Sequence, residues 1–175
     1  MLQSKKKSFN QIKIHSQYSI CEGALKIESL KEYCKKNKIQ SVGLSDTYNL
    51  SGALEFSESI SSVGTQPIIG SQIQFRFKNT YGLIPLIAKN YVGYKNLIEL
   101  SSKAYLENTD NDQPHCSIDN LIKNNEGIIV LSGSVLNFFS RPLNESFFKL
   151  SSIFAIFEVM LGSIGLEGIG LKSHL

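Results

Sequence analysis

Short apolar runs alternate along this chain with segments of helical periodicity, and this alternation restricts the fold more than any other feature. Four runs rich in Val, Ile and Leu occupy residues 39–46, 67–75, 81–89 and 127–134. Helical spacing of apolar side chains is found over residues 25–38, 50–60, 91–106 and 118–124. Because most of the apolar runs are too hydrophobic to keep one face in water, they are typical of covered strands. The sequence therefore predicts an α/β architecture with a largely parallel sheet or barrel.

The beginning of the chain adds a further candidate strand. Residues 9–16 alternate with a period of two, which places Lys13 and His15 on the same face. In α/β folds the functional side chains gather at the carboxyl ends of the strands. Four polar residues lie at or near such predicted ends: His15, Asp46, Gln72 and Ser134.

Composition and charge indicate one globular domain and argue against several other classes. The 175 residues are 42% apolar, which is enough for a hydrophobic core. A net charge of +3 is too small to indicate a nucleic-acid-binding surface by itself. Residues 5–7 are lysines, but no apolar signal core follows them, which argues against secretion. Cys21, Cys34 and Cys116 lack CxxC spacing and are expected to be free thiols in a reducing cytoplasm.

The segment 147–171 is apolar but interrupted by charges. Its most hydrophobic window, residues 150–166, is at the low end of bilayer-spanning length and has Glu158 in its middle. We therefore expect a buried or poorly packed helix here and no membrane partner. The closely spaced glycines of residues 162–170 do not follow a clear strand and lack G-x-G-x-x-G, so they do not predict a nucleotide site.

Five sequence blocks occur in a fixed order: IKIHSQYSICEGALKIESL, GLSDTYNLSGALEF, QPIIGSQI, LIPLIAKNYVGYKNLIELSS and EGIIVLSGS. Together they resemble the N-terminal PHP (polymerase and histidinol phosphatase) domain of the alpha subunit of bacterial DNA polymerase III. The resemblance covers residues 8–137. The second and fourth blocks resemble this subfamily more than PHP proteins in general.

The resemblance implies a distorted PHP-type β/α barrel. Such a barrel needs further strands after residue 137, so we expect it to be incomplete at its C-terminal end. The implied division is a basic extension at residues 1–8, a PHP-like domain at 9–140 and an atypical apolar tail at 141–175.

The resemblance also implies a site that can be compared ligand by ligand with the metal-binding form of the family. The corresponding positions form a vestigial site of eight residues: Lys13, His15, Glu22, Asp46, Thr47, Gln72, Gly82 and Ser134. Five of these replace a His, Glu or Cys ligand, and only His15 and Glu22 remain usable. A catalytic zinc site normally needs three protein ligands, and the ammonium of Lys13 repels a cation. We therefore expect no catalytic residue and no cofactor, with Zn or Mn bound only if the site is less degenerate than this comparison implies.

Several alternatives for single residues stay open. A metal could still bind if the lost ligands were replaced by His115, Cys116 or His174. None of these three residues occupies a ligand position of the family. Asp46 is expected to cap the following helix or to bond a turn amide rather than to act in catalysis. His15 is expected to be a hydrogen-bonded polar residue, and Lys13 to replace the charge of a lost metal.

The resemblance implies a non-catalytic role in DNA replication. The implied partners are the remainder of the polymerase alpha subunit, the proofreading exonuclease subunit and, through the holoenzyme, DNA. The carboxylates of a DNA-directed DNA polymerase (nucleotidyltransferase) lie in a later part of that subunit, so this chain alone is not expected to polymerise DNA.

Two alternatives differ in class from this role. The first is a free-standing metal-dependent phosphoesterase or 3′-5′ exonuclease of the PHP family, which metal content and turnover would reveal. The second is that the chain is a natural truncation or the product of a split or frameshifted gene, with the break near residues 142–148.

Overall fold

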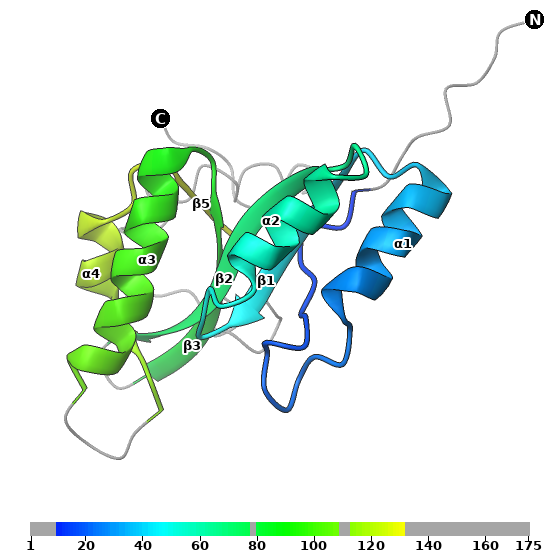
Figure 1. Cartoon of the computed structure of the whole chain (residues 1–175). Helices are drawn as coiled ribbons and strands as arrows, with labels where there is room; N and C mark the ends of the chain where they lie inside the picture. The colour runs from blue at the N-terminus through cyan, green and yellow to red at the C-terminus, as the bar shows by residue number, and fades with distance from the viewer. Residues whose placement is uncertain (1–9, 78–79, 109–112, 132–175) are drawn as a thin grey trace, which may run out of the picture.

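The computed structural model describes residues 10–77, 80–108 and 113–131 (Figure 1). The elements follow in the order α1 (Ile27–Asn37), β1 (Ser41–Thr47), α2 (Ala53–Ser61), β2 (Gln66–Phe77), β3 (Thr80–Ala88), α3 (Tyr91–Leu106), β4 (Cys116–Ser117), α4 (Ile118–Lys123) and β5 (Ile128–Val130). The predicted α/β class and the four predicted helices are confirmed. The apolar runs form β1, β2, β3 and β5.

The sheet is mixed, which corrects the prediction of a largely parallel one. Its strand order is β1-β2-β3-β5, with β4 pairing β2 away from this path. β1 and β2 are parallel, whereas β2 with β3 and β3 with β5 are antiparallel. Only residues 78 and 79 separate β2 from β3, and a parallel pair needs a crossover of a dozen or more residues. The short connection therefore requires an antiparallel turn.

The strand predicted over residues 9–16 is only partly formed. Its described part pairs through isolated bridges, Ile14 with Leu44 and Ser16 with Leu25. It nevertheless runs alongside β1, where the Gly43 amide donates to the Gln11 carbonyl at 2.8 Å. A Cβ at Gly43 would collide with the backbone of Ile12, so glycine allows this close approach. The segment is an irregular edge rather than a regular strand.

The structure contains one short strand that the sequence patterns do not predict. Cys116 and Ser117 form β4, which pairs in parallel with Phe75 and Arg76 of β2. Two residues are too short to show any periodicity.

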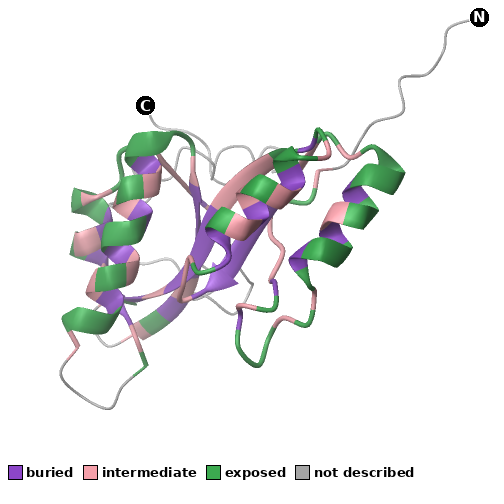
Figure 2. Ribbon diagram, viewed as in Figure 1, coloured by how far each residue is buried: buried purple, intermediate pink, exposed green. Residues whose placement is uncertain are grey.

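All four helices cover one face of the sheet, and the core lies between them (Figures 1 and 2). One buried cluster joins Ile73, Phe75, Ile84 and Leu86 of the sheet to Leu97 and Leu100 of α3 and Leu121 of α4. A second joins Val42 and Leu44 of β1 to the inner sides of α1 and α2. The other face carries the neighbouring pair Thr47 and Gln72, because side chains alternate along a strand.

The start of α3 is held against the segment that precedes β5. The Asn90 side chain accepts a hydrogen bond from the Gly93 amide and caps the helix. Lys89 donates its backbone N–H to the Gly127 carbonyl at 2.8 Å. A Cβ on Gly93 would collide with the backbone of Gly127, which itself has a φ of +69°. Two glycines thus allow direct backbone contact between these elements.

None of the helices in the described ranges is both long and apolar enough to cross a bilayer. The apolar segment 147–171, the basic extension 1–8 and the tail 141–175 lie outside the described residues.

Candidate functional site

The Asp46 carboxylate lies at the centre of a buried hydrogen-bond network. Asp46 is 1% exposed and accepts three hydrogen bonds, from the Ser16 amide at 2.6 Å, the Ser16 hydroxyl at 2.7 Å and the Ser19 hydroxyl at 2.8 Å. Oδ1 takes two of these donors, so both of its lone pairs are used. The side chain bonds a turn amide and does not cap α2, whose N-cap is Gly52. Charge-assisted bonds of this kind compensate for the burial of the carboxylate.

Ser19 connects Asp46 to the next two polar residues. Its hydroxyl donates to Asp46 and accepts the Thr47 amide at 3.0 Å. His15 Nδ1 lies 3.4 Å from the same oxygen. Because Ser19 donates its proton to Asp46, a hydrogen bond between His15 and Ser19 requires that His15 Nδ1–H be the donor and the Ser19 oxygen the acceptor. The buried position of Ser19 and the commitment of its proton leave it unsuited to act as a nucleophile.

Glu22, Thr47 and Gln72 form the second half of the cluster. The Thr47 hydroxyl donates to Glu22 Oε2, and the same carboxylate oxygen lies 3.9 Å from His15 Nδ1. Gln72 is paired with Thr47 in the β1–β2 register, and each is 7% exposed. The structure therefore brings His15, Glu22, Thr47 and Gln72 to one place, with Asp46 directed into the adjoining serine turn.

Three other predicted site residues are placed differently. Gly82 lies opposite Phe75 in the β2–β3 register, so it belongs to the face covered by the helices rather than to that of Gln72. Lys13 is half-buried and forms no ion pair with another described residue. Ser134 lies outside the described residues.

The residues considered for rescue of a metal site do not join this cluster. Cys116 lies opposite Phe75 and packs in the core beneath α3, where burial raises the pKa of its thiol to about 12. His115 makes an edge contact with the Tyr81 ring, 5.1 Å between centroids. His174 lies outside the described residues. In the part of the chain that the structure describes, no three His, Cys, Asp or Glu side chains are grouped to hold a metal ion.

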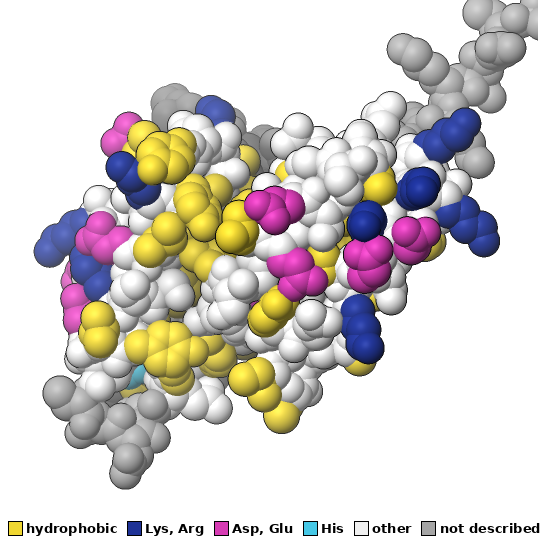
Figure 3. All heavy atoms as spheres, viewed as in Figure 1, with side chains coloured by type: hydrophobic (Ala, Val, Ile, Leu, Met, Phe, Trp, Pro, Cys, Tyr) yellow, Lys and Arg dark blue, Asp and Glu magenta, His cyan; other side chains and the backbone are white. Residues whose placement is uncertain are grey.

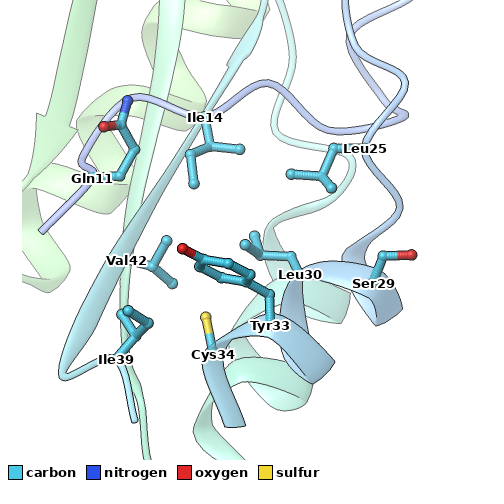
Figure 4. A pocket seen from close by; sticks show the side chains of 9 residues that line it. All are labelled: Gln11, Ile14, Leu25, Ser29, Leu30, Tyr33, Cys34, Ile39 and Val42. Atoms are coloured by element: carbon cyan, nitrogen blue, oxygen red, sulfur yellow. The ribbon is translucent and has the colours of Figure 1, made fainter. Parts of the chain in front are cut away.

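An apolar cavity of about 560 Å³ lies near the cluster but is separate from it (Figure 4). Its walls come from the segment before Ser16, from α1 and the residues that flank it, and from β1, and include Ile14, Leu25, Leu30, Cys34 and Val42. Ile14 and His15 are successive residues of an extended segment and point to opposite sides. Burial raises the pKa of the Cys34 thiol on this wall. The cavity contains no carboxylate or imidazole and is unsuited to metal chemistry.

Several residues that organise the site were not predicted from the sequence. Ser16 and Ser19 hold Asp46, and the only sequence signal they leave is their own spacing of three residues, directly after His15. Tyr18 anchors the same turn to α2 by donating to Glu55 Oε2 at 2.6 Å, and this carboxylate raises the pKa of Tyr18. Tyr48 adopts a φ of +63° and donates its amide to the Gln72 carbonyl at 2.8 Å. Burial, and then the Glu22 carboxylate, raise the pKa of Tyr48.

Comparison with known proteins gives the family context of this arrangement. The sequence profile of the PHP domain matches residues 11–171. The DNA polymerase III subunit alpha of Haemophilus influenzae is 30% identical over 86% of this chain and 13% of its own length. The same subunit of Caulobacter vibrioides is 37% identical over 71% of this chain and 12% of its own length. The subunit of Rickettsia prowazekii is 39% identical over 70% of this chain and 10% of its own length. The resemblance predicted from the motifs is confirmed.

Solved structures are more distant. An amidohydrolase from Chromobacterium violaceum aligns with 55% of this chain and 33% of its own, at 14% identity and a TM-score of 0.46, too far to support an argument. The curated relatives are much longer proteins, of which this chain spans between 10% and 13%. The profile match includes residues beyond 140, within the segment that the sequence assigns to a tail. With most of its length matched by the profile, this chain belongs to the PHP domain family.

Proposed function

We propose that this chain is the N-terminal PHP domain, or a fragment of it, of a replicative DNA polymerase III alpha subunit. Its role would be structural and partner-docking, in the cytoplasm, without metal chemistry of its own. The observation that most supports a domain without metal chemistry is the hydrogen bonding of the Asp46 carboxylate. Its carboxylate is occupied by three protein donors from Ser16 and Ser19. Asp46 corresponds to a ligand in the metal-binding form of the family, but in this chain its carboxylate is used for hydrogen bonds within the fold.

The remaining donors do not fit a metal of this family. His15 and Glu22 offer one imidazole and one carboxylate, and Glu22 already accepts the Thr47 hydroxyl. Thr47 and Gln72 stand where a ligating His and Glu are implied, and neutral hydroxyl and amide oxygens are poor ligands for zinc. A site with two usable ligands lacks the three that a catalytic zinc requires. We therefore derive no reaction step through a metal.

The first prediction concerns metal content. After dialysis without chelator, the purified chain should contain well under one equivalent of Zn or Mn, measured by inductively coupled plasma mass spectrometry. Hydrolysis of a generic phosphate ester should not exceed that of a buffer blank with added Mn²⁺. Stoichiometric metal together with turnover would instead establish the alternative function, a PHP phosphoesterase or exonuclease.

The proposed partners are the remainder of the alpha subunit and the proofreading exonuclease subunit. Support comes from the relatives, which are polymerase alpha subunits several times longer than this chain. Association can be measured by mixing the full chain with the separately purified remainder of the subunit from the same organism. A stable complex is expected with that remainder. If no complex forms, the proposed structural role within the alpha subunit is wrong, whereas membership of the PHP domain family is not affected.

A second prediction concerns nucleic acid. With a net charge of +3, the chain should bind a primer-template weakly, and its affinity should fall steeply with salt because only phosphate contacts contribute. Fluorescence anisotropy at several salt concentrations measures both quantities. Tight binding that resists salt would reveal a base-reading or structured site and would contradict the proposal that DNA is contacted only through partners.

The division into residues 1–8, 9–140 and 141–175, and a barrel left incomplete at its C-terminal end, are also parts of this proposal. Their support is the resemblance of the motif blocks before residue 137.

A further inference from the structure

We draw no further inference here: the strongest candidate, the exposed hydrophobic patch over α3 and toward α2 (Figure 3), carries no proposal because nothing in the described part of the chain shows what covers it.

Discussion

Asp46→Ala should lower the free energy of unfolding by about 3–5 kcal/mol, the largest effect we expect from a single polar substitution in this chain. The side chain is buried and accepts the Ser16 amide and the Ser16 and Ser19 hydroxyls. Without the carboxylate, these buried donors lose their acceptor, and each unsatisfied group costs about 1–3 kcal/mol. Urea denaturation followed by circular dichroism measures the change.

Two variants make this result specific. Glu32→Ala removes an exposed carboxylate from α1 and should change stability by less than about 0.5 kcal/mol. Asp46→Asn keeps the shape but presents an NH₂ group to at least one donor, so it should fall between the wild type and Asp46→Ala. A loss below about 1 kcal/mol for Asp46→Ala would mean that the serine turn is not held by the carboxylate.

Restoring three ligands should produce a metal site. The variant Lys13→His, Thr47→His and Gln72→Glu adds two imidazoles and a carboxylate to the side that already has His15 and Glu22. Thr47 and Gln72 are neighbours in the sheet register, and Thr47 contacts Glu22. With three or more ligands available, zinc content should rise from well under one equivalent to about one per chain.

The control for this experiment is a fourth substitution. Glu22→Gln in the restored background should reduce zinc affinity at least about tenfold, because one ligand becomes neutral. Competition with a zinc-chelating dye measures both affinities. A restored variant that folds but takes up no metal would show that the ligand positions inferred from the family are misplaced in this chain.

The sequence was informative wherever the signal was local. Helix α3 was predicted with the bounds that the structure gives it, because its apolar spacing extends over four turns. α1 and β1 were predicted within two residues at each end. The antiparallel pairing of β2 and β3 was not predicted, because strands that are apolar on both faces are typical of parallel sheets.

The candidate site was predictable in its composition but not in its geometry. Family comparison pointed to the cluster of His15, Glu22, Thr47 and Gln72. It also pointed to Gly82, which strand register places on the other face, and one residue of register is enough to reverse a side chain. The serine turn around Asp46 depends on contacts between residues about 30 positions apart, which no local pattern reports.

The contact between Gly93 and Gly127 has a consequence for how the molecule opens. Two hydrogen bonds and this backbone contact join the first two turns of α3 to the segment before β5. Lys89 donates its backbone N–H to the Gly127 carbonyl, and the Asn96 side chain donates to the Glu126 carbonyl at 2.8 Å. Segments joined in this way tend to unfold as one cooperative unit. Amide protons of the first turns of α3 and of β5 should therefore exchange with solvent at similar rates, and the start of this helix would open only together with the strand beside it.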